Sequence, residues 1–397
     1  MRGGGAGAVG CGDDFCNVGI GMDRRRFVAG VVAAGAGSVS RRSPGAAPLR
    51  LLVLGGTRFI GIHTVRLAVE RGHDVTLFNR GKTNASLFPQ LRHLKGDRNG
   101  DIGALASRSW DAVIDDSGYF PRAVRLTAEL LAPSVRQYVF ISTISVYASS
   151  AQANGEESAT ARIADETAEK VDEETYGPLK ALCEQAAEQA MPGRITVLRP
   201  GLIVGPEDNT DRFTYWPARA SRGGEFVAPN RPSDAIQYID ARDLARFTLD
   251  AIERGIHGTF NVISPPGKLT IGELVTESVD AAKHMARPGS PPRPVWLPAE
   301  FLEAQKVEAW SDMPVWVPET GDNAGFAHTL TARAEKAGLK IRPMRDTVRD
   351  TLAWQLGRPQ AEQAKLRAGI SADREREVLA EWRRTLLRRT TGEQKRG

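Results

Sequence analysis

A tyrosine and a lysine stand four residues apart, as Tyr176 and Lys180, in the stretch TYGPLKALCEQAAEQA at residues 175–190. On a helix this spacing puts both side chains on one face, and Pro178 suits a first helical turn. A free phenol has a pKa of about 10, and a nearby ammonium favours its ionised form, so the pair could exchange a proton with a substrate. The same spacing also occurs by chance in ordinary helices, so the surrounding elements must support the interpretation.

A second candidate comes from the run QYVFISTISVY at residues 137–147, which is apolar at first and turns polar at Ser142 and Thr143. The pattern is typical of a buried strand with a polar end. The Thr143 hydroxyl could hold a substrate oxygen and stabilise charge that develops on it. Thr143, Tyr176 and Lys180 therefore form a candidate catalytic set.

The elements that would position this set begin with a strand, a glycine-rich turn and a helix. The aliphatic run LRLLVLGG at residues 49–56 is typical of a strand buried on both faces of a parallel sheet. A helix is expected over 62–74 and a second strand over 75–81. The glycines of the turn are Gly55, Gly56 and Gly61. They allow a tight turn and close approach to a pyrophosphate at the helix N-terminus, so the unit predicts nucleotide binding. The alternative is an α/β turn that binds nothing.

Later runs extend the same pattern. Further strands are expected over 91–97, 110–119, 137–147 and 258–264, a strand with the loop after it over 194–206, and further helices from 176, after 240, over 270–282 and over 345–355. The predicted fold class is α/β, a Rossmann-type doubly wound parallel sheet with a smaller C-terminal substrate lobe.

These motifs resemble those of the extended short-chain dehydrogenase/reductase family, the NAD(P)-dependent epimerase/dehydratases. GGTRFIG is similar to the family turn GGxGFIG, the strand end to S-[ST]-x-x-VY, and Tyr176-x-x-x-Lys180 to YxxxK. The resemblance spans residues 49–356. One departure is Arg58, which replaces the middle glycine of the turn and either crowds the pyrophosphate or contacts a phosphate.

The resemblance implies that Thr143, Tyr176 and Lys180 are catalytic. The residues expected at the cofactor are Gly55, Gly56, Thr57, Arg58, Phe59, Ile60, Gly61, Asn79, Arg80, Asp97, Ser117, Gly118, Ser142, Tyr176 and Lys180. No metal site is expected, because the three cysteines form no CxxC motif and no even framework.

The choice of cofactor depends on the residues directly after the second strand. A carboxylate there would bind the adenosine ribose of NAD(H), whereas this chain has Asn79, Arg80 and Lys82. Two cations could hold a 2′-phosphate, so NADP(H) is favoured over NAD(H). The alternative is that both cations are solvated loop charges.

The implied activity is that of an NAD(P)-dependent oxidoreductase or epimerase acting on a sugar or sugar-nucleotide-like hydroxyl or keto substrate. Dehydratases of the family carry an Asp-Glu pair after the catalytic threonine, where this chain has Ile144 and Ser145, so that route of water loss is not expected. The first βαβ unit also resembles the chloroplast stem-loop-binding branch. RNA binding, or use of the fold without turnover, is therefore the alternative.

The substrate side carries few motifs. Asp240 is expected to cap a helix or form an ion pair. The tryptophans Trp296, Trp310 and Trp316 are expected to cover the core rather than stack on a ligand. The residues in segments that often face the substrate are Asn209, Asp211, Arg212, Arg231 and Gln237.

The chain ends are basic. Residues 1–50 hold seven Arg against three Asp, and residues 331–397 hold 17 Lys or Arg against nine Asp or Glu, whereas the body has an acidic excess. A nucleic-acid partner is therefore not expected, nor is a stable membrane span. A homodimer is a possible assembly.

The expected domains are a leader (1–48), the dehydrogenase (49–356, with the cofactor part mainly in 49–200 and the substrate lobe mainly in 201–345) and a basic helical tail (357–397). Within the leader, RRRFV at 24–28 resembles a twin-arginine export signal, which predicts a periplasmic or exported protein. The alternative is a basic tail on a cytoplasmic protein.

Overall fold

The structure is a computed structural model and describes residues 48–393. The predicted leader and its twin-arginine pattern lie outside these residues. Among the helices of the described part, none is both long enough and apolar enough to cross a membrane.

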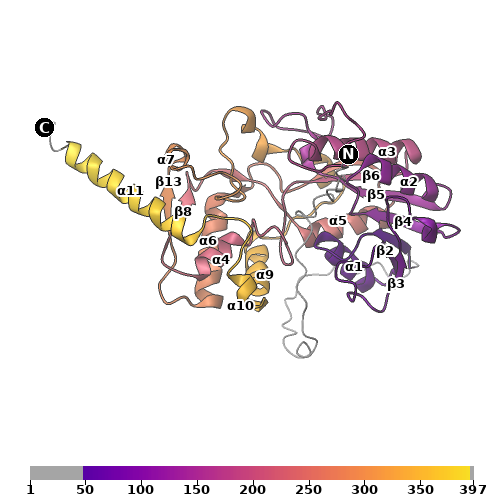
Figure 1. The fold of residues 1–397 in the computed structure, drawn as a ribbon, viewed down its shortest axis with the longest axis horizontal. Coiled ribbons are helices and arrows are strands. Elements are labelled where there is room, and N and C mark those ends of the chain that lie inside the picture. The colour runs from indigo at the N-terminus through magenta and orange to yellow at the C-terminus, as the bar shows by residue number, and fades with distance from the viewer. Residues whose placement is uncertain (1–47, 394–397) are drawn as a thin grey trace, which may run out of the picture. The chain divides into compact units, whose positions relative to one another are not determined.

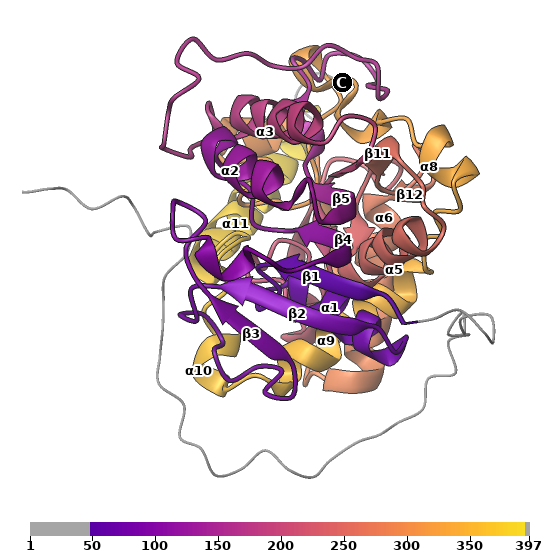
Figure 2. The ribbon, with the colours of Figure 1, turned by 90° about the vertical axis from the view of Figure 1, so that its right-hand side faces the viewer.

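A seven-stranded sheet with every pair of neighbouring strands parallel forms the centre of the fold (Figures 1 and 2). Its order is β11-β6-β5-β4-β1-β2-β3. The strands are β1 (Arg50–Leu54), β2 (Asp74–Asn79), β3 (Arg92–Lys95), β4 (Trp110–Asp115), β5 (Val135–Ile141), β6 (Ile195–Pro200) and β11 (Gly258–Val262). The predicted doubly wound sheet is confirmed.

Helices cover both faces of this sheet. Alternate residues of β1 point to opposite faces, so Leu51 and Val53 join one buried cluster and Leu52 and Leu54 join the other. The helices are α1 (Ile60–Glu70) and α5 (Ala241–Glu253) on the first face, and α2 (Pro121–Leu131) and α3 (Tyr176–Ala190) on the second (Figure 2). The continuous aliphatic run is therefore buried on both sides, as predicted.

The strands end earlier than the sequence predicted, and after two of them, β4 and β5, a polar side chain bonds to the backbone that follows the strand. β4 stops at Asp115, whose carboxylate accepts the N–H of Ser117 at 3.1 Å. β5 stops at Ile141, and Thr143 caps the 3₁₀ turn η3 (Ile144–Val146) by accepting the N–H of Ser145 at 3.1 Å. The polar ends of both strands therefore lie in irregular backbone at the carboxyl edge of the sheet.

The second part of the chain surrounds its own hydrophobic core, which includes Trp216, Trp316 and Phe226. Three two-stranded ribbons belong to it: β7 (Ile203–Val204) with β10 (Ile239–Asp240), β8 (Glu225–Pro229) with β13 (Arg293–Leu297), and β9 (Ala235–Ile236) with β12 (Leu269–Thr270). The helices of this part are α4 (Tyr215–Ser221), α6 (Ile271–Ala281), α7 (Ala299–Ala304), α9 (Met344–Gly357) and α10 (Gln360–Gln363), whereas α8 (Ala332–Lys336) packs against β11 of the seven-stranded sheet. The short helical turns of this part are η4 (Ala282–Ala286), η5 (Gly321–Asn323) and η6 (Phe326–His328), and η2 (Gly103–Leu105) lies between β3 and β4 of the sheet.

The C-terminal helix α11 (Ala372–Glu393) begins on this second core (Figure 1). Val378 and Leu379 are buried in it, and Trp382 packs edge-on against Phe301 with ring centroids 4.8 Å apart. Glu375 forms a buried ion pair of 2.7 Å with Arg219 of α4. The first half of the helix is therefore anchored by apolar contacts and by charge.

Candidate active site

The glycine turn between β1 and α1 has a backbone that other residues rarely adopt. Gly55 and Gly56 have φ angles of 121° and 81°. The turn is tied to β2, since Asn79 donates its side-chain amide to the carbonyl of Gly55 at 2.9 Å and the Gly55 N–H bonds to Phe78 at 3.0 Å. Within the described residues, no side chain caps α1 and its first turn holds no acidic residue. The helix N-terminus beside the turn therefore suits an anion.

The carboxylate of Asp116, which comes directly after β4, fills the inside of this turn. Its Oδ2 accepts the N–H of Gly56 at 3.1 Å. A Cβ atom placed on Gly55 or Gly61 would lie only 1.8 Å or 2.2 Å from a carboxylate oxygen of Asp116. Burial, together with the negative charge of Asp115, raises the pKa of Asp116 to about 7, although the hydrogen bond from Gly56 acts to lower it. Sequence reasoning missed this residue, although two aspartates in succession after a buried strand were a visible signal.

The neighbouring Asp115 faces the other side of β4 and has its hydrogen-bond partners there. Arg98 forms a bidentate pair with it at 2.5 Å and 2.6 Å, and the Tyr138 hydroxyl donates to it at 2.6 Å. The Ser117 hydroxyl donates to the carbonyl of Leu54 at 2.7 Å. Ser117, predicted as a cofactor contact, therefore joins the ends of β4 and β1 in this structure.

Tyr176 begins α3 and lies beside Thr143, because Gly177 allows the helix to approach η3. A Cβ atom on Gly177 would lie 2.1 Å from the carbonyl oxygen of Ser145. The structure therefore brings two of the three predicted catalytic residues together, through a glycine that sequence reasoning did not single out. The tyrosine and lysine are both on α3, as the spacing predicted.

The Lys180 ammonium was expected to favour the phenolate of Tyr176, and this effect stays a prediction, because the two side chains have different partners in this structure. Burial raises the pKa of Tyr176, and the groups that oppose this are the nearby Thr143 hydroxyl and the positive charge of Arg212. The Lys180 ammonium, which is 4% exposed, instead donates to the carbonyls of Gly118 at 2.8 Å and Ile141 at 2.7 Å. Desolvation of the phenol dominates, and the ammonium is held by backbone oxygens.

A buried polar network holds the end of β5 against α3. The Ser142 hydroxyl donates to Glu184 of α3 at 2.5 Å. Glu184 in turn pairs with Arg199 of β6 through contacts of 2.6 Å and 3.0 Å. Arg199 also donates to the Tyr147 hydroxyl at 3.2 Å. Ser142 is therefore engaged inside the protein, and its predicted contact with a cofactor stays a prediction.

The cations expected near the adenosine end lie on the surface. Arg80 and Lys82 come after β2, are exposed and form no ion pair with any residue that the structure describes. Asp97 comes after β3, and its carboxylate accepts the N–H of Asn99 at 3.0 Å. Arg58 is partly exposed in the turn itself. The roles of these residues at a cofactor stay predictions.

Arg212 is the residue of the second part of the chain whose charge reaches Tyr176. Its guanidinium lies over the ring of Trp310, 4.9 Å from the centroid, and its Nε donates to Thr210 at 3.2 Å. Burial lowers the pKa of Arg212, and the negative charge of Asp208 acts in the opposite direction. Within the described residues Arg212 forms no ion pair, so it could receive an anionic group beside the tyrosine.

Other residues expected at the substrate have structural partners. Gln237 bonds to the backbone of Ser264 and Thr329, and Asp211 bonds to Arg358 at 3.2 Å. Asp240 caps α5, which confirms the predicted helix cap. Trp316 is buried in the second core, while Trp296 and Trp310 pack against it, which confirms their predicted place at the core.

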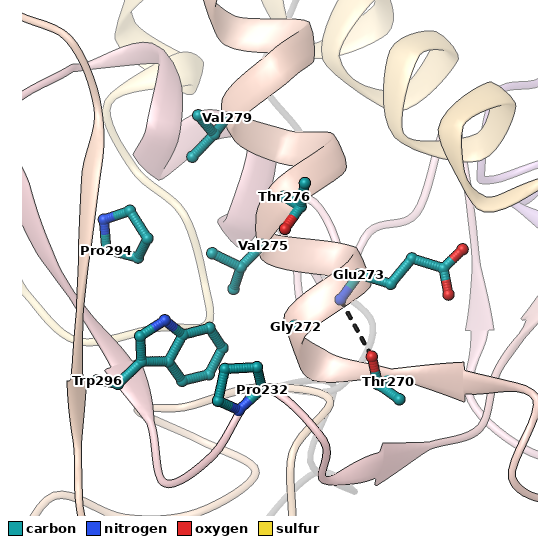
Figure 3. Close-up of a pocket in the computed structure, with 9 residues that line it drawn as sticks. All are labelled: Pro232, Thr270, Gly272, Glu273, Val275, Thr276, Val279, Pro294 and Trp296. Carbon is teal, nitrogen blue, oxygen red and sulfur yellow. Dashed lines mark hydrogen bonds between the residues drawn. The ribbon is translucent and has the colours of Figure 1, made fainter.

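A pocket of about 410 Å³ lies on the second part of the chain (Figure 3). It is lined by Pro232, Thr270, Gly272, Glu273, Val275, Thr276, Val279, Pro294 and Trp296. Val275 and Val279 point toward the side of Trp296, whereas the Glu273 carboxylate points away from it (Figure 3). None of the predicted catalytic or cofactor residues lines this pocket. In the part of the chain that the structure covers, no group of metal-ligating side chains is assembled either.

Comparison with known proteins adds a family and a fold. A model of the NAD dependent epimerase/dehydratase family matches residues 51–262. The chloroplast stem-loop binding protein of 41 kDa b from Arabidopsis thaliana is 29% identical over 277 residues, which cover 64% of this chain and 67% of that protein.

Solved structures share the fold at low identity. The Bordetella bronchiseptica enzyme WbmG, in complex with NAD and UDP, is 16% identical with a TM-score of 0.56, over 82% of this chain and 99% of that one. The UDP-N-acetylglucosamine 4-epimerase from Bacillus cereus is 17% identical with a TM-score of 0.53, over 77% and 98% of the two chains.

Proposed function

Because the chain belongs to the NAD dependent epimerase/dehydratase family, we propose that it transfers hydride between a nicotinamide dinucleotide and a sugar-like hydroxyl or keto substrate. The observation that carries this proposal is the position of Tyr176 beside Thr143, at the same edge of the sheet as the glycine turn. In open parallel sheets, ligands bind at the carboxyl ends of the strands.

The glycine turn fits a dinucleotide. Gly55 and Gly56 adopt positive φ angles, and α1 presents an uncapped N-terminus within the described structure. Gly55, Gly56 and the first residues of α1 would hold the pyrophosphate, and Arg58 would lie close to it. When bound, the nicotinamide accepts or supplies the hydride.

The protein's own groups would move the proton. Thr143 would hold the substrate oxygen, and Tyr176 would donate a proton to that oxygen or remove one from it. Arg212 supplies positive charge that favours the phenolate of Tyr176. Lys180 bonds to the carbonyls of Gly118 and Ile141, so it would hold the loop after β4 and the end of β5 in position at the site.

NADP(H) is the cofactor we propose. The support is that no carboxylate comes directly after β2 and that Arg80 and Lys82 are exposed there, where a 2′-phosphate could bind. WbmG is in complex with NAD, so the choice between the two dinucleotides depends on this chain's own residues.

The test is to purify the protein, identify any retained nucleotide, and follow NAD(P)H absorbance with a panel of UDP-sugars and keto sugars. Tyr176→Phe should abolish turnover while dinucleotide binding persists. The matched control is Tyr215→Phe, because the buried Tyr215 hydroxyl has no hydrogen-bond partner in the described structure, and this variant should keep full activity. Undiminished turnover in Tyr176→Phe would refute the assignment.

RNA binding is a second candidate function, supported by the similarity to the Arabidopsis stem-loop binding protein. Binding of a labelled RNA hairpin, titrated from about 50 to 200 mM salt, would test it, because phosphate contacts must weaken steeply over that range. Tight, salt-dependent hairpin binding by a protein that does not bind dinucleotide would favour this function over the first.

A further inference from the structure

The carboxylate of Asp116 lies in the turn that would bind the dinucleotide. It accepts the N–H of Gly56, and its two oxygens take up the space that side chains at Gly55 and Gly61 would need. All three glycines of the turn are therefore in contact with one acidic group. A dinucleotide pyrophosphate would bring a second negative group to the same turn and to the same end of α1.

The charged groups around Asp116 do not pair with it. Arg98, from the loop after β3, is committed to Asp115 by two bonds. Lys180, from α3, is committed to the carbonyls of Gly118 and Ile141. Asp115, from β4, adds negative charge to the neighbourhood. In the residues that the structure describes, Asp116 has no ion-pair partner.

Two anions at one turn repel each other, and the repulsion is stronger than in water because Asp116 is only partly exposed. The dinucleotide keeps its pyrophosphate charge at all ordinary pH values. The group that can give up its charge is therefore Asp116, which becomes neutral by taking one proton from solvent. A protonated carboxyl keeps an oxygen that can accept the Gly56 N–H.

We propose that Asp116 is a dinucleotide-site residue that binds one proton when the dinucleotide binds. This inference rests on the proposed function, because it requires that the glycine turn takes a dinucleotide. It predicts that the affinity for the dinucleotide depends on pH through a residue on the inner side of the turn.

The direction in which the dinucleotide affinity changes with pH follows from the protonation of Asp116 on binding. Below the pKa of free Asp116, about 7, the carboxyl is already neutral and affinity should not change with pH. Above it, the ionised carboxylate must be protonated on binding, so Kd should rise by about tenfold for each pH unit.

The test measures NADH and NADPH binding by calorimetry between pH 5.5 and 9, in buffers that differ in ionisation enthalpy, which counts the protons taken up. The 2′-phosphate of NADPH itself titrates near pH 6, at about the second pKa of a phosphate ester, so NADH gives the simpler profile. Asp116→Asn keeps the size and the acceptor oxygen for Gly56 but has no charge to lose. The matched control is Asp101→Asn, which neutralises an exposed aspartate.

Wild type and Asp101→Asn should take up close to one proton at pH 8 and show the tenfold slope. Asp116→Asn should take up none and bind with an affinity that is nearly independent of pH, so its advantage over wild type should reach about tenfold at pH 8. Equal pH profiles in wild type and Asp116→Asn would overturn the inference.

Two further measurements keep the test decisive. If Asp116→Asn does not fold, Asp116→Ser replaces it, since a shorter polar side chain also carries no charge; proton uptake that persists in that variant would overturn the inference, and its loss would support it. If neither dinucleotide binds at any pH, the proposed function itself fails, which is a different result from binding without proton uptake.

Discussion

The buried ion pair between Glu184 and Arg199 permits a quantitative test of how the end of β5 is held against α3. Arg199→Met removes the guanidinium and keeps a long apolar side chain. The carboxylate of Glu184, whose side chain is 9% exposed, would be left with the Ser142 hydroxyl as its remaining donor in the described structure. Removal of one partner therefore leaves a buried charge that is nearly uncompensated.

The magnitude comes from the burial of the pair. Two unit charges about 4 Å apart interact by about 4 kcal/mol at an effective dielectric constant of about 20. Breaking a buried pair from one side costs about 3–5 kcal/mol, whereas replacing both partners by apolar residues is often neutral. We therefore expect Arg199→Met to lower the free energy of unfolding by about 3–5 kcal/mol and Glu184→Leu/Arg199→Met to recover most of that loss.

Urea unfolding followed by circular dichroism measures these differences. Arg376→Met is the matched control, because its ion pair with Asp373 has side chains that are 74% and 83% exposed, and exposed pairs contribute about 1 kcal/mol or less. A cost below about 1 kcal/mol for Arg199→Met, or a double variant no more stable than the single one, would refute this account of the network.

Three shorter predictions concern other parts of the site. Gly177→Ala puts a Cβ atom against the Ser145 carbonyl, so it should cost about 1–3 kcal/mol in a thermal or urea melt and reduce turnover; a variant as stable and active as wild type would contradict the close approach. Burial would raise the pKa of Asp240, but Arg242 lowers it below 3.8, so its ionised form stabilises the fold at neutral pH. Asp240→Asn should therefore be less stable than wild type at pH 7, and the gap should narrow as the pH falls below 3.8; a constant gap would contradict this. Arg80→Ala should weaken NADPH binding by roughly tenfold, or about 1.4 kcal/mol, and leave NADH binding unchanged in fluorescence titrations; equal effects on both would remove the argument for NADP(H).

Much of the fold could be read from consecutive residues. A strand covered by helices on both faces must be apolar along its whole length, and the run at β1 shows that directly. The turn after it needs residues without a Cβ atom, and Gly55 and Gly56 meet that need with positive φ angles. Helical spacing likewise put Tyr176 and Lys180 on one helix. These requirements are local, so neighbouring residues are sufficient to express them.

Packing between distant segments decided the rest of the site. Asp116 lies inside a turn some sixty positions before it in the chain, and its neighbours in the sequence mark it as a polar strand end without identifying that turn as its partner. Gly177 is needed because η3 approaches α3 there. The direction in which the pKa of Tyr176 shifts depends on how deeply the phenol is buried and on which groups surround it.

The amino-acid pattern by itself therefore determined the sheet, the glycine turn and the identity of the residues that could do chemistry, because backbone geometry and burial on two faces constrain each short segment. Which of those residues meet, and in what charge state, was decided only by the tertiary structure. Desolvation and electrostatic interaction act between atoms that are close in space, whatever their separation along the chain.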